Sequence, residues 1–155
     1  RYSLMMPPPN NTKGTMSRIT IDVLERQAEA MGLKVLESDI PGTTCGLYCD
    51  RLNTIWLADW LNDRQRLCTL CHELVHAKYR DLGCGTRFGV KCERRARRET
   101  ASTLISPVEF AMAEEVYGDN AWMMAAELDV TMQVLTDYRQ ILSERTRIIR
   151  SCGRL

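Results

Sequence analysis

The stretch CTLCHELVHAKYRD, residues 68–81, contains both histidines of this 155-residue chain, His72 and His76. In a helix, side chains four residues apart lie on the same face, so the two imidazoles would point at one spot. Glu73 follows His72 directly and would be rotated from it by roughly 100°. A His-Glu-x-x-His pattern arises by chance in such a chain about once in a thousand. The stretch therefore predicts a metal site on a helix, with a carboxylate beside it.

The third ligand of this site must come from another segment. A catalytic zinc ion takes three protein ligands and keeps its fourth position for water. No histidine remains, so the ligand must be a carboxylate or thiolate, and the segment after the motif offers Cys92, Glu93 and Glu99. On a helical wheel, Glu93 lies with the small apolar residues, whereas Glu99 lies on the opposite side among arginines. An inward carboxylate is costly unless a cation neutralises it, so we predict that His72, His76 and Glu93 bind Zn2+.

The chemical role of Glu73 follows from its position beside the metal. Zinc lowers the pKa of a water molecule to about 7, and Glu73 reaches past the ligands toward that water. We therefore predict that Glu73 is the catalytic residue, acting as general base.

Length and composition indicate one domain with one active centre. The first 17 residues combine a proline run with Asn, Thr, Gly and Ser, which predicts a flexible N-terminal arm at 1–17 and a domain at 18–155. The chain has seven cysteines, an odd number, and no export signal at its start, so free thiols are expected rather than disulfides.

The charge and hydropathy of the chain exclude some partners. The net charge is +1 and 26% of residues are charged, so neither nucleic acid nor an anionic membrane is an expected partner. No apolar run approaches the roughly 18 to 20 residues that span a bilayer. We therefore expect a soluble, cytoplasmic protein.

Hydrophobic periodicity predicts the α+β class, with a small antiparallel sheet of about three strands packed on the motif helix and a mainly helical C-terminal half. The last two strands are expected to form a hairpin, and Ser106 with Glu109 is expected to form a capping box. The predicted helices are 19–31, 62–79, 91–105, 107–118 and a C-terminal pair within about 120–150, and the predicted strands are 33–40, 43–50 and 54–61.

These motifs resemble the ImmA/IrrE metallo-endopeptidases of bacteria and phages. That family has a helix reading H-E-x-x-H-A, a variable loop, and a second helix of the form E-x-x-A that leads to two aliphatic residues and a proline. The matching residues here are His72 to Ala77, Glu93 to Ala96, Leu104, Ile105 and Pro107. The resemblance covers about residues 19–142 and departs from the pattern at Arg97, where the family usually has asparagine.

The resemblance implies a zincin-like single domain in which His72, His76 and Glu93 bind zinc and Glu73 is the catalytic glutamate. It also implies that the substrate is a protein, usually a transcriptional repressor of a phage, a mobile element or a stress response. On this hypothesis the strand Thr54–Ala58 could pair with an extended substrate. Tyr48 and Tyr79 are candidate donors to the oxyanion.

Two other functions remain open. Residues 121–142 could form a helix-turn-helix for DNA, although Asp129 stands where glycine is usual, and Met132, Gln133 and Asp137 would face the groove. Alternatively, the chain could be a catalytically silent zinc-binding module that binds a regulator. The arginines at 94, 95, 97 and 98 would then form a docking face for an acidic partner, or simply a solvated surface.

Overall fold

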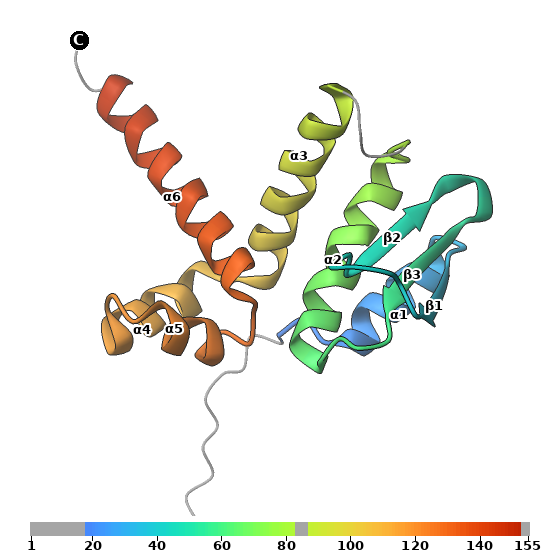
Figure 1. Cartoon of the computed structure of the whole chain (residues 1–155). Helices are drawn as coiled ribbons and strands as arrows, with labels where there is room; N and C mark the ends of the chain where they lie inside the picture. Colours follow the sequence, from blue (N-terminus) through green and yellow to red (C-terminus); the bar gives the residue numbers. More distant parts are fainter. Residues whose placement is uncertain (1–17, 83–86, 153–155) are drawn as a thin grey trace, which may run out of the picture.

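Three strands and six α-helices make up the part of the chain that the computed structural model describes, residues 18–82 and 87–152 (Figure 1). The first half contains α1 (Ile21–Ala30), β1 (Lys34–Ser38), β2 (Gly46–Cys49), a 3-10 turn (Asp50–Leu52), β3 (Thr54–Ala58) and α2 (Asp63–Tyr79). The second half contains α3 (Arg87–Leu104), α4 (Pro107–Tyr117), α5 (Ala121–Glu127) and α6 (Met132–Cys152). The predicted arm at 1–17 lies outside the described residues.

The sheet is mixed, and the prediction of an antiparallel sheet was wrong. β3 lies in the middle, parallel to β1 and antiparallel to β2. It takes the centre because it is the most apolar strand, with Ile55 and Leu57 fully buried. The chain therefore crosses from β1 to the far edge before it returns through the β2–β3 hairpin, which was predicted correctly. Alternation of apolar residues identifies strands but not the order in which they pair.

The helix that carries the motif, α2, lies between the sheet and α3 (Figure 1). One side of α2 packs against α1 and the sheet, where Leu70 and Leu74 join the first core cluster. The other side faces α3, and Cys68 joins a second cluster formed by α3 to α6. Asn62 begins α2 through a capping box with Gln65. A helix packed on both sides gives its side chains fixed positions.

Two local details differ from the sequence predictions. α3 begins at Arg87, inside the predicted loop, since a single glycine at 89 weakens a helix without ending it. α4 begins at Pro107 as predicted, but the hydroxyl of Ser106 makes no capping bond. The carboxylate of Glu109 instead accepts a hydrogen bond from Arg18 at 2.7 Å. The predicted capping box is therefore absent, and the Glu109 carboxylate takes part in a tertiary ion pair.

Helices of this fold are short or polar, and within residues 18–82 and 87–152 none has the length and apolar character to cross a membrane. The described cysteines, which exclude Cys84, are all free thiols.

Gly46 allows β2 to lie directly on α2. A Cβ atom at this position would lie 2.6 Å from Cγ2 of Thr69 and 3.2 Å from Cγ of Glu73. Gly46→Ala is therefore expected to push β2 away from α2 and to lower the free energy of unfolding by about 1–3 kcal/mol. Urea denaturation followed by circular dichroism measures this change. An unchanged midpoint and slope would show that β2 can move outward without cost.

Candidate metal centre

His72, His76 and Glu93 converge on one point between α2 and α3. The two Nε2 atoms lie 3.1 Å apart, and the Glu93 oxygens lie 3.3 Å from Nε2 of His72 and 3.4 Å from Nε2 of His76. Ligands bound tetrahedrally at about 2.0–2.1 Å are separated by about 3.3 Å. Oε1 of Glu93 lies toward His72 and Oε2 toward His76, so the spacing of the two imidazoles and the carboxylate suits one metal ion. Among the described residues, these three side chains are the group of His, Cys, Asp or Glu residues that lie close enough together to hold a metal ion.

The close approach of α2 and α3 depends on small residues. Ala96 and Ala101 on α3 are fully buried, and Ala101 belongs to the core cluster that contains Cys68 of α2. Both are small apolar residues on the side of α3 that carries Glu93, as the helical wheel predicts. Larger side chains there would hold Glu93 away from the imidazoles, so the packing of the two helices positions the third ligand.

The electrostatics of the site favour a cation. Burial lowers the pKa of His76, but its hydrogen bonds to Glu93 and Asp81 outweigh this and raise the pKa to about 9. Hydrogen bonds to His72 and His76 hold the pKa of Glu93 far below its ordinary value. A proton on His76 thus occupies a place that suits a divalent ion, and metal binding at neutral pH requires its release. Two imidazole nitrogens and a carboxylate are a donor set that fits zinc.

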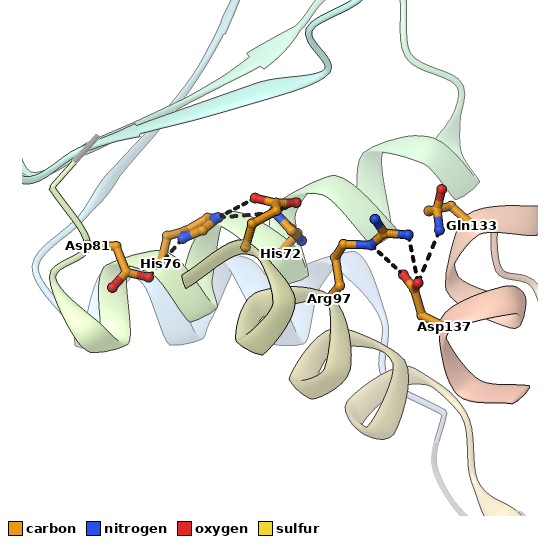
Figure 2. A network of polar contacts seen from close by, with 7 residues as sticks. His72, His76, Asp81, Arg97, Gln133 and Asp137 are labelled. Carbon is orange, nitrogen blue, oxygen red and sulfur yellow. Dashed lines mark hydrogen bonds and ion pairs between the residues drawn. The ribbon is translucent and has the colours of Figure 1, made fainter. Parts of the chain in front are cut away.

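Asp81 orients one of the ligands, a role that the sequence analysis missed. Its Oδ2 lies 2.9 Å from Nδ1 of His76 (Figure 2). Its Oδ1 accepts a hydrogen bond from Arg95 at 2.5 Å. A carboxylate on Nδ1 fixes the tautomer in which Nε2 is available to bind a metal ion. Arg80 ends α2 in the left-handed conformation, at φ 52°, and so turns the chain back to bring Asp81 against His76. An acidic residue just past the end of the motif helix was the only sequence signal.

Removal of the Asp81 carboxylate is expected to weaken metal binding. Asp81→Ala should raise the dissociation constant for Zn2+ by about 10- to 100-fold, because His76 loses the group that orients it. Competition with a chromophoric zinc chelator measures the constant. Asp50→Ala is the matched control, since Asp50 bonds Arg80 and Tyr48 but contacts no proposed ligand. Equal constants for the two variants would rule out this role for Asp81.

Glu73 lies beside the three ligands without joining them. Its side chain is buried, with the residue 8% exposed. Burial raises its pKa, and the neighbouring imidazoles and the backbone of Tyr48 partly offset the effect. A buried carboxylate with a raised pKa is a better proton acceptor than one in water. Its hydrogen bond with the backbone of Tyr48 connects the motif helix to β2.

The site opens into a cleft with a volume of about 1170 Å³, whose walls are β2, α2, α3 and the start of α6. The prediction that Thr54–Ala58 pairs with substrate was wrong, because β3 is already paired on both sides. The exposed edge belongs to β2. Since the N–H of Ala58 bonds the carbonyl of Cys45, alternation turns the backbone groups of Gly46 and Tyr48 toward the outer edge, where the N–H of Tyr48 bonds the Glu73 carboxylate. Among the described residues no strand pairs with that edge.

The two tyrosines predicted as oxyanion donors are engaged elsewhere. The hydroxyl of Tyr48 donates to Asp50 at 2.8 Å, and burial together with that carboxylate raises its pKa to about 12. The hydroxyl of Tyr79 lies 2.5 Å from Glu99, outside the cleft lining. Neither hydroxyl points to the three ligands, so the structure gives no support to this pair of predictions.

The arginines of α3 also differ from a simple solvated face. Arg95, Arg97 and Arg98 pair with Asp81, Asp137 and Glu144, so they connect α3 to its neighbours. Arg97 lies on the cleft side with Glu93, because it follows Glu93 by four residues. The sequence analysis grouped it with the other arginines and overlooked this spacing.

α5 and α6 form consecutive helices joined by a tight turn in which Asp129 adopts the left-handed conformation, at φ 54°. This agrees with the local prediction of a helix-turn-helix. However, Gln133 and Asp137 face the cleft, and Asp137 is bonded to Arg97 (Figure 2). Residues that would read a DNA groove thus contact the protein itself, which disfavours the DNA-binding alternative.

A small sheet over a His-Glu-x-x-His helix, with a second helix that carries a candidate acidic ligand, defines a single zincin-like domain of the metallopeptidase type. The family model described as the IrrE N-terminal-like domain, Peptidase_M78, matches residues 28–137. The chain therefore belongs to this family of metallopeptidase-like enzymes, and the match includes every residue of the candidate metal centre. No curated protein matches the chain.

Proposed function

We propose that this protein is a zinc-dependent endopeptidase that cleaves a regulatory, repressor-like protein in the cytoplasm. The observation that carries the proposal is the triangle of ligand atoms from His72, His76 and Glu93, with the buried carboxylate of Glu73 beside it. Structural zinc sites use four protein ligands, whereas three ligands leave room for chemistry. A buried acid next to three ligands is the arrangement that hydrolysis needs.

Each residue of the site would have a separate role in peptide hydrolysis. When bound, zinc would act as a Lewis acid on the scissile carbonyl and lower the pKa of water. Glu73 would take the proton of the attacking water and pass it to the leaving amine. Asp81 would hold His76 in the productive tautomer. The unpaired edge of β2 would bind the substrate backbone as an added strand, beside Glu73.

Support for a repressor-like substrate comes from family membership alone, whereas support for peptide binding comes from the open edge of β2 and the size of the cleft. An extended peptide on β2 would run across the mouth of the metal centre. The proposal therefore predicts cleavage within an extended or loosely folded segment of the substrate.

Comparison of new protein N-termini tests the proposal directly. Zinc-loaded and metal-stripped protein are each incubated with a lysate of the source cells, and new N-termini are identified by mass spectrometry. The expected result is a small set of zinc-dependent cleavages that includes a DNA-binding regulator. Zinc-dependent cleavage of other proteins only would support the peptidase activity but contradict the proposal that the substrate is a regulator. Bound zinc without any cleavage would favour the catalytically silent module.

A further inference from the structure

A second polar cluster lies on the wall of the same cleft. Arg97 donates to Asp137 through Nε at 3.0 Å and through Nη2 at 2.7 Å, and Gln133 donates to Asp137 at 3.1 Å (Figure 2). All three residues line the cleft that contains the metal centre. The side chain of Asp137 is 14% exposed and that of Arg97 is 40% exposed. The carboxylate is therefore held inside the wall, while part of the guanidinium reaches the cleft.

The geometry of this pair leaves one edge of the guanidinium available. Asp137 occupies the edge formed by Nε and Nη2. A guanidinium has five N–H donors, and the edge formed by Nη1 and Nη2 can receive a second carboxylate in the same forked manner. Within residues 18–82 and 87–152, no other side chain bonds that edge. Asp137 and Gln133 thus fix an arginine whose remaining donors face the cleft.

The distance from Arg97 to the metal centre suits substrate recognition. Arg97 follows Glu93 by four residues on α3, so the two side chains leave the helix about 6 Å apart on one face. An extended peptide advances about 3.3 Å per residue. A substrate side chain that reaches Arg97 would therefore belong to a residue close to the cleaved bond.

We propose that Arg97 forms a carboxylate-binding subsite that selects substrates with aspartate or glutamate near the scissile bond. The inference rests on the proposed endopeptidase function and deepens it. A carboxylate suits this site because the guanidinium fork matches its two oxygens, whereas a lysine would meet the positive charge of Arg97. Asp137 already neutralises part of that charge, so the selectivity should be moderate, about tenfold.

Cleavage of a proteome-derived peptide library tests the subsite. Zinc-loaded wild type, Arg97→Gln, Arg97→Lys and Arg98→Gln are compared by mass spectrometry for residue frequencies around each cleaved bond. Arg98→Gln is the matched control, because it removes another ion pair of α3 with α6, to Glu144, outside the cleft. Circular dichroism melts verify that the variants fold.

Wild type and Arg98→Gln are expected to prefer Asp and Glu over Asn and Gln by about tenfold at one position. Arg97→Gln should lose this preference while it still cleaves peptides, and Arg97→Lys should keep only part of it. An acidic preference that survives in Arg97→Gln, or is lost equally in Arg98→Gln, would contradict the subsite. Arg97 would then have only the structural role of linking α3 to α6. Cleavage without acidic preference in wild type would overturn the subsite alone. A wild type that cleaves no peptide would overturn the proposed function and the subsite with it.

Discussion

Glu73→Gln is expected to slow peptide hydrolysis by about 10²- to 10⁴-fold while the protein keeps its metal. Glutamine has the shape of glutamate and can fill the same buried position under β2, but it cannot accept a proton from water at neutral pH. The candidate ligands are His72, His76 and Glu93, so zinc binding should persist. Initial rates on a library peptide that wild type cleaves, with zinc content measured on the same samples, give both quantities.

The matched control for this experiment is Glu99→Gln. Glu99 is also a glutamate close to the motif helix, but it bonds Lys78 and Tyr79 outside the cleft. It should cleave at the rate of wild type. If Glu73→Gln cleaves as fast as the control, another group takes the proton and the assignment of Glu73 is wrong. If Glu73→Gln loses zinc as well, its carboxylate supports the metal rather than the reaction.

Short-range periodicity explains why much of the candidate centre could be predicted. The spacing of His72 and His76 places them on one helix face, and the helical wheel of α3 places Glu93 with Ala96 and Ala101. In the structure these residues meet, with Ala96 and Ala101 buried at the contact. Each inference needed only the period of a helix and the cost of a buried charge.

The parts that could not be predicted depend on contacts between distant segments. The parallel pairing of β1 with β3 depends on the path of the chain, which alternation does not encode. Asp81 reaches His76 only because Arg80 adopts the left-handed conformation, and arginine at that φ is uncommon. Tyr48 was a candidate donor by residue type, yet its hydroxyl bonds Asp50. Side-chain partners of this kind follow from the tertiary fold.

The position of α3 connects these results to function. α2 supplies two ligands and Glu73, whereas α3 supplies Glu93 and Arg97 and is tied to α6 through Asp137. The metal would therefore cross-link the two halves of the molecule, which meet where α2 lies beside α3 (Figure 1). Because a ligand that binds only the folded protein stabilises it, zinc should raise the melting temperature of the wild type.

Glu93→Ala is expected to weaken zinc binding by more than about 100-fold, the upper range for loss of a group that merely orients a ligand. With Glu93 removed, only the two imidazoles of α2 remain, and α3 no longer contributes to the site. The stabilisation by zinc should fall at the same time, because the metal would no longer join α2 to α3. Zinc content after dialysis and melting temperature with and without zinc measure the two effects.

Glu99→Ala separates loss of a ligand from loss of an acidic residue on the same helix. It removes a carboxylate that bonds Lys78 and Tyr79, and it should keep both the zinc and the thermal shift of wild type. Equal zinc loss in both variants would indicate that the charge of α3, rather than coordination by Glu93, holds the ion. Full zinc retention in Glu93→Ala would contradict the proposed ligand triangle, because two imidazoles one helical turn apart would then bind the ion without α3.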